Sequence, residues 1–177
     1  MLEVIPTLHH FRLEVKRRRY SDPVTATPWL GPEEKEAWTG LISMVLLLPG
    51  QLEAPLQHEA GLTLFEYMTL SHLSEAPERR IRMSGLAFLA NGSLSRLSNV
   101  VTRLERRGWV RRTPDPDDGR YTLAVLTDAG QEVVVAAAPV HVRSVRELVL
   151  DPLTKADRQA LVRIAAKLRV RPGDQPR

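Results

Sequence analysis

One short stretch of the chain concentrates side chains that make directional hydrogen bonds. Between Leu94 and Arg107, serine, arginine, asparagine and threonine alternate with leucine and valine. An arginine guanidinium can bind the O6 and N7 atoms of guanine through two hydrogen bonds, and an asparagine amide can do the same for adenine. Hydroxyl groups can donate to phosphate oxygens. This stretch therefore carries the chemistry of nucleic-acid contact, provided that one element presents these side chains together.

The spacing of the apolar residues supplies that element. Leu94, Leu97, Val100, Val101 and Leu104 follow one another at intervals of 3, 3, 1 and 3, which places them on one stripe of an α-helix. Ser93 is suited to cap the first turn, and Gly108 stands where a left-handed residue ends a helix. The opposite, polar face then holds Ser95, Arg96, Ser98, Asn99, Thr102, Arg103 and Arg106.

The residues before this helix predict a partner for it. A short helix over residues 82–90 would bury Met83, Leu86, Leu89 and Ala90, and Asn91-Gly92 is a tight-turn sequence. Two short helices joined by such a turn, the second with a hydrogen-bonding face, form a candidate helix-turn-helix.

A β-hairpin is predicted directly after it. Residues 109–113 and 120–126 have the aromatic and β-branched content of strands, and residues 114–119 form a dense cluster of proline, aspartate and glycine. A helix-turn-helix followed by a hairpin with a polar tip is a winged helix. Arg120 at that tip is suited to a narrow minor groove, where negative potential is concentrated. Asp118 would repel phosphate there unless it pairs with an arginine.

Longer helices flank the winged helix. The first runs over residues 32–57; Pro49-Gly50 is expected to interrupt it, and it then resumes with a kink. The next has Thr63 as N-cap, Glu66 in a capping box and its end at Ala76-Pro77. Thr127 is expected to cap the following helix, residues 128–150, which bends at Pro139. A last helix starts at Thr154 and carries Leu161, Ile164, Ala165 and Leu168 on one side. These helices hold more apolar surface than a winged helix needs, so we expect a dimer interface rather than an enlarged monomer core.

Composition and charge narrow the function classes. The 177 residues include no cysteine, which excludes disulfides and thiol chemistry, and 43% hydrophobic with 26% charged residues is typical of a soluble protein. Apolar runs such as Met44–Leu48 are short for a membrane span, and no secretory signal is evident. Residues 79–120 hold ten arginines and four acids, whereas residues 21–78 hold nine acids and one lysine. This polarity predicts one face for a polyanion. Motifs for zinc hydrolysis, phosphate loops, dinucleotide binding or serine nucleophiles do not occur, so we expect no enzyme activity and no cofactor or metal.

Several stretches resemble the MarR family of bacterial transcriptional regulators, and the likeness runs from about Trp38 to Leu168. The sharpest are Gly61–Tyr67, Arg82–Ala87 and Arg103–Val110. The strongest is Asp117-Asp118-Gly119-Arg120 followed by Ala124–Gly130. The resemblance implies a mainly α-helical fold with a small β-hairpin wing, acting as a homodimer on palindromic DNA.

The resemblance also implies how the chain is divided. We expect a flexible basic N-terminal arm (1–30), a helical dimerisation region (31–58 and 128–170), a winged helix-turn-helix DNA-binding domain (59–127) and a C-terminal tail (171–177). Ser95, Arg96, Asn99 and Arg103 are the expected base readers, Arg120 enters the minor groove, and Asp118 has a structural role in the wing. Ser93, Ser98 and Thr102 are expected nearer to phosphates. A cleft for a small aromatic or anionic effector would draw on Trp38, His58, Tyr67, His72 and Met83.

The predicted function is a cytoplasmic, sequence-specific regulator of transcription, a repressor, whose partners are double-stranded DNA, a second copy of itself and an effector, with no membrane. Two alternatives stay open. A winged helix kept for protein interaction would use its basic face on an acidic partner and show no operator preference. A DNA-binding protein without an effector would respond only to its own concentration.

Overall fold

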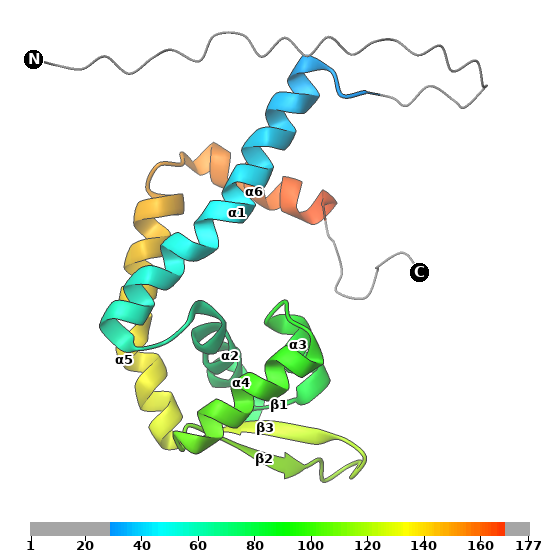
Figure 1. Cartoon of the computed structure of the whole chain (residues 1–177), viewed down its shortest axis with the longest axis vertical. Helices are drawn as coiled ribbons and strands as arrows, with labels where there is room; N and C mark the ends of the chain where they lie inside the picture. The colour runs from blue at the N-terminus through cyan, green and yellow to red at the C-terminus, as the bar shows by residue number, and fades with distance from the viewer. Residues whose placement is uncertain (1–28, 169–177) are drawn as a thin grey trace, which may run out of the picture.

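The computed structural model describes residues 29–168, so the predicted arm, apart from the exposed Trp29 and Leu30, and the predicted tail at 171–177 lie outside the described residues. Figure 1 shows a winged lobe from which long helices extend. Along the chain the elements are α1 (Pro32–Ala60), α2 (Leu64–Glu75), the 3-10 turn η1 (Pro77–Arg79), β1 (Arg80–Arg82), α3 (Met83–Leu89), α4 (Leu94–Arg106), β2 (Val110–Pro114), β3 (Thr122–Leu126), α5 (Asp128–Val145), the π-helical turn η2 (Arg146–Leu150) and α6 (Lys155–Lys167).

Helix α1 is continuous, and the prediction that Pro49-Gly50 interrupts it is wrong. The helix runs through both Pro49 and Pro55 and ends at Gly61, which has a left-handed φ of 63°. Each internal proline removes one backbone donor and crowds the preceding turn. The helix nevertheless persists because it packs along α5 and buries Leu56, which offsets the lost hydrogen bonds. In the described part of the chain, α1 is also the one helix whose length and hydropathy would suffice to cross a membrane.

The other helix starts follow the predicted capping pattern. Thr63 accepts a hydrogen bond from the Glu66 N–H at 3.1 Å while the Glu66 carboxylate accepts one from the Thr63 N–H, which completes the capping box. Thr154 and Asp157 form the same box at the start of α6, whereas Thr127 caps α5 by accepting one hydrogen bond from the Gly130 N–H. Helix α5 continues through Pro139, and its departure from α geometry comes later, in the π turn that begins at Arg146.

The small sheet has three strands rather than the two of a hairpin. All pairs are antiparallel in the order β1-β3-β2, with Ile81 opposite Ala124 and Arg112 opposite Ala124 on the other side. The short helix was predicted to begin at Arg82, and that prediction is wrong, because Arg82 ends β1 and α3 begins at Met83. A strand of three residues has no pattern of its own, and β1 exists because β3 offers it an open edge.

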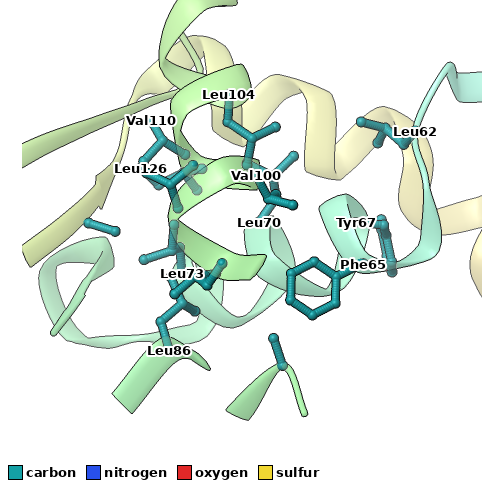
Figure 2. Close-up of a cluster of buried hydrophobic side chains, with 14 of the residues drawn as sticks. Leu62, Phe65, Tyr67, Leu70, Leu73, Leu86, Val100, Leu104, Val110 and Leu126 are labelled. Carbon is teal, nitrogen blue, oxygen red and sulfur yellow. The ribbon is translucent and has the colours of Figure 1, made fainter. Parts of the chain in front are cut away.

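The hydrophobic core lies between α2, α3, α4 and the sheet of the winged lobe (Figure 2), and Leu56 of α1 and three residues of α5 complete it. Leu97, Val101 and Leu104 of α4 are completely or almost completely buried, as their spacing predicts. Two predicted core residues are not buried: Leu89 is 43% exposed at the end of α3 and Leu94 is 53% exposed at the start of α4. Both stand in terminal turns, where a helix reaches beyond the elements that cover its centre.

Large apolar side chains stay exposed outside the winged lobe. On α1 they include Trp38, Met44 and Leu47, and on α6 they include Leu161 and Ile164, each between 44% and 64% exposed. No residue of α6 is buried. A soluble protein rarely leaves an apolar surface of this extent facing water unless another surface covers it.

Candidate nucleic-acid interface

Helix α4 begins in a turn that brings polar groups to its N-terminus. Ser93 accepts a hydrogen bond from the Arg96 N–H at 3.2 Å, and its hydroxyl lies 3.1 Å from that of Ser95. Gly92 is required in this turn because a Cβ there would lie 2.6 Å from the ring of Phe65. The first turn of α4 is therefore tightly fixed and presents two hydroxyls beside its N–H groups.

The face of α4 opposite the core points to solvent. Ser95, Asn99 and Arg106 are all exposed, and their spacings of four and seven residues align them along the outside of the helix. Residues on such a line reach the same groove of a bound duplex. The sequence analysis placed Arg106 on the polar face but did not predict that it contacts DNA. Its exposure and its position on this line add it to the site.

The flank of α4 that faces α2 is occupied by internal contacts. The Arg96 guanidinium lies over the Phe65 ring, 4.2 Å from its centroid, and remains exposed. Arg103 donates from Nε to the Glu66 carboxylate at 3.2 Å, and the Glu66 side chain is only 5% exposed. Arg103 thus holds α4 against α2, a role that the helical pattern alone could not reveal.

The charge of Glu66 is stabilised where it lies. Burial favours the neutral acid and raises its pKa, but the hydrogen bonds from the Thr63 N–H and the Arg103 guanidinium outweigh burial and leave the pKa below its ordinary value. Glu66 is therefore a buried carboxylate at neutral pH, and Arg103 is the cation that pairs with it.

The opposite flank of α4 is bound to the wing. Arg112 of β2 donates through its backbone N–H to Glu105 at 2.9 Å and forms an ion pair with the same carboxylate. Its second terminal nitrogen donates to the Ser98 carbonyl at 2.8 Å and to the Thr102 hydroxyl at 3.2 Å. Ser98 and Thr102, two of the predicted phosphate contacts, are only partly exposed and bind Arg112 instead. The sequence analysis missed Arg112 because its partners lie 7 to 14 residues away.

A groove of about 410 Å³ separates the start of α4 from the wing. Three arginines contribute to its wall, together with the exposed Leu94. Its lining consists of Arg82, Met83, Ser84, Leu94, Ser98, Arg112, Arg120, Tyr121 and Thr122. Cationic groups around an open groove are suited to an extended polyanion.

The wing tip is held by two ion pairs. Asp118 accepts from Nε of Arg120 at 2.9 Å and from a terminal nitrogen at 2.6 Å, which confirms the predicted pairing of Asp118 with an arginine. This contact lowers the pKa of Asp118 and raises that of Arg120. Arg82 pairs with the buried Asp115 at 2.5 Å and stacks on Tyr121, 4.5 Å from the ring centroid. Arg120 nevertheless remains 84% exposed.

The five residues predicted for an effector cleft lie on different parts of the single chain. Trp38 is exposed on α1 and His58 is exposed near its end, whereas Met83 lines the groove beside α4. Tyr67 is buried with its ring 4.5 Å from that of His141, and burial raises the pKa of Tyr67. His72 is partly buried on α2. Within residues 29–168 no group of three or more histidine or acidic side chains has the arrangement of a metal site.

Known proteins share this architecture. The sequence model of the MarR family matches residues 62–122. The transcriptional regulator HosA of Escherichia coli O111:H- is 30% identical over 113 residues, which is 63% of this chain and 82% of that protein. Sco3205, a MarR family transcriptional regulator from Streptomyces coelicolor solved in complex with DNA, is 42% identical, with a TM-score of 0.76 over 81% of this chain and 89% of that one. CouR from Rhodococcus jostii RHA1, solved with p-coumaroyl-CoA, shares the fold at 23% identity, with a TM-score of 0.64 over 75% of this chain and 92% of that one.

Proposed function

Because the chain belongs to the MarR family of DNA-binding transcriptional regulators, which are not enzymes, we propose that it acts as a homodimeric repressor on palindromic operators. The observation that carries the proposal is the outer line of α4, where Ser95, Asn99 and Arg106 stand exposed beside a groove walled by arginines. Repression follows where the operator overlaps a promoter, since a bound dimer then excludes the polymerase.

Base reading is assigned to the outer face of α4. Asn99 is placed for a bidentate contact with adenine, and Ser95 donates to a neighbouring base edge. Arg96 reaches guanine from the flank of the helix. Because stacking on Phe65 already restricts its side chain, binding costs less conformational entropy. Arg103 is retained as a positioning residue rather than a base reader, because its guanidinium already pairs with Glu66.

Phosphate contacts are assigned to the start of α4 and to the wing. Ser93 lies at the helix N-terminus, where the backbone N–H groups favour an anion. Ser98 and Thr102 act through Arg112, which their hydroxyls help to orient. Arg120 enters the minor groove in an orientation set by Asp118. The winged helix-turn-helix domain is thereby proposed to span residues 59–127.

Dimerisation is assigned to α1 and to the C-terminal helices, within residues 31–58 and 128–170. The exposed apolar side chains of α1 and α6 provide the surface, and a second copy of the chain covers it. A dimer interface of this kind accounts for the length and apolar character of α1, which would suffice to cross a membrane, in a DNA-binding protein. Two copies present two reading helices, and half-sites in successive turns lie roughly 34–36 Å apart.

A small aromatic or anionic effector completes the proposal. It binds between the dimer helices and the winged lobe, where the Tyr67 ring of α2 lies against His141 of α5. Trp38, His58, His72 and Met83 are further proposed contributors. A ligand there changes the distance between the two α4 helices, and a modest change releases one half-site. As a regulator of chromosomal DNA, the protein works in the cytoplasm.

The test is DNA binding by the full chain at near-physiological salt. An operator is selected from a randomised duplex pool by the wild-type protein, and its affinity is compared with that of a scrambled duplex. We expect Asn99→Ala to lose about 5- to 150-fold in affinity and to relax preference at one base pair. Arg120→Ala should weaken binding to all sequences and reduce the salt dependence by about one phosphate contact.

Arg111→Ala is the matched control, because Arg111 is exposed on the strand face opposite Arg112 and its removal changes the charge equally. Equal affinity of the wild-type protein for the selected and the scrambled duplex would contradict the proposal. Failure to bind either duplex even at low salt would favour a protein-interaction module instead.

A further inference from the structure

Leu94 is an apolar side chain in a place where the fold gives it no cover. It is the first residue of α4 and is 53% exposed, whereas Leu97, one turn later, is completely buried. Its position one turn before Ser98 and two before Thr102 directs it to the wing side of the helix, into the groove described above. An isolated exposed leucine is common, but this one stands at the reading end of a helix among hydroxyls and arginines.

The surroundings of Leu94 restrict what can cover it. Arg82, Arg112 and Arg120 line the same groove. Each pairs with a carboxylate, but the Arg120 side chain stays 84% exposed, so an uncharged apolar partner would still lie against an exposed guanidinium. Tyr121 also lines the groove, but its ring is held beneath the Arg82 guanidinium at 4.5 Å. The occupant must therefore combine negative charge with a small apolar group at the depth of the helix start. Duplex DNA has both: its phosphates are anionic, and the C5-methyl group of thymine is the apolar group on the base edges of the major groove.

We propose that Leu94 is a specificity-determining residue that contacts the C5-methyl group of a thymine in each half-site. The inference rests on the proposed function, in which α4 enters the major groove. Ser95, the next residue, lies on the outer face of the helix and donates to the adjacent base edge, so the first turn reads two positions by different chemistry.

The experiment removes the methyl group from the DNA and the side chain from the protein. Each symmetric pair of thymines in the selected operator is replaced by uracil, and affinity for the full-chain protein is measured by competition at near-physiological salt. Burial of one methyl group corresponds to roughly a fourfold change in affinity per half-site, or about 15-fold for both. We expect one pair of positions to show this loss with the wild-type protein and to show none with Leu94→Ala.

Leu89→Ala is the matched control, because Leu89 is similarly exposed at 43% but does not line the groove. It should retain the full uracil effect. If the wild-type protein selects an operator but no uracil effect depends on Leu94, the inference is overturned while the proposed function stands. If the wild-type protein shows no preference among duplexes, both fail together.

Discussion

Replacing Arg103 separates a reading role from a positioning role. In Arg103→Ala, the Glu66 carboxylate loses its only ionic partner among the described residues and keeps the hydrogen bond from the Thr63 N–H at 3.1 Å. The carboxylate stays buried, because α2, not Arg103, fixes its position in the capping box. The variant thus leaves a buried carboxylate without its cation, and an unpaired buried charge strongly destabilises a protein.

The size of the effect follows from the exposure of the two partners. Removing one partner of a fully buried ion pair costs about 3–5 kcal/mol. Arg103 is 50% exposed, so water can approach the carboxylate once the guanidinium is gone, and the remaining capping hydrogen bond retains part of the stabilisation. We therefore expect a loss of about 2 kcal/mol in the free energy of unfolding. For a chain of this size that loss lowers Tm by about 4–8 °C.

The assay is urea and thermal unfolding at one fixed protein concentration, since unfolding of the proposed dimer would depend on concentration. Arg106→Ala is the control, because Arg106 is an exposed arginine one turn later on the same helix. In a Glu66→Gln background, Arg103→Ala should cost less than about 1 kcal/mol, because no buried charge remains to be stranded. Operator preference, measured well below Tm, should be unchanged by Arg103→Ala.

The opposite pattern would refute this reasoning. If Arg103→Ala left the free energy of unfolding unchanged and removed preference at a single base pair, Arg103 would be a base reader, and the ion pair with Glu66 would have no energetic role. Equal destabilisation in the Glu66→Gln background would likewise show that the two side chains do not interact.

Three further predictions follow from the same contacts. Burial lowers the pKa of His141 beneath its ordinary value, so the unfolded chain binds more protons between the two pKa values and stability falls as pH decreases below about 6.5. His141→Phe should flatten that decline in urea midpoints measured at successive pH values. Arg112→Ala should lower the free energy of unfolding by about 1–2 kcal/mol and weaken binding to all DNA sequences alike. Unfolding and fluorescence anisotropy measure the two effects, and full DNA affinity in the variant would contradict the prediction. Leu161→Glu should convert the proposed dimer to monomers in sedimentation, whereas Phe88→Glu, a substitution at an exposed position on the winged lobe, should not.

Local signals predicted most of the framework. The capping residues Thr63, Ser93 and Thr127 each begin a helix where expected, because an N-cap depends on a few adjacent residues. Gly108 ends α4 with a left-handed φ of 74° for the same local reason. The buried stripe of α4 was predictable because its period is helical throughout.

What the sequence could not predict depends on distant partners. β1 requires the edge of β3, more than 40 residues later in the chain, and Arg103 pairs with a carboxylate 37 residues earlier. The excess of arginine in residues 79–120 was read as surface charge. Six of those ten arginines form ion pairs, and three of the acids, Glu66, Glu78 and Asp128, come from outside that segment. Counting charge along the chain therefore exaggerates the positive field that DNA would meet.

These ion pairs bear on how DNA binding could be regulated. Arg103 joins α4 to α2 on one flank, and Arg112 joins it to β2 on the other, so the reading helix and the wing are fixed in one lobe. A ligand that altered the orientation of α4 within that lobe would have to break charged contacts on both sides. Changing the distance between two intact lobes breaks none of them. We therefore expect regulation to act through the long helices α1 and α5, which pack along each other and extend away from the winged lobe (Figure 1).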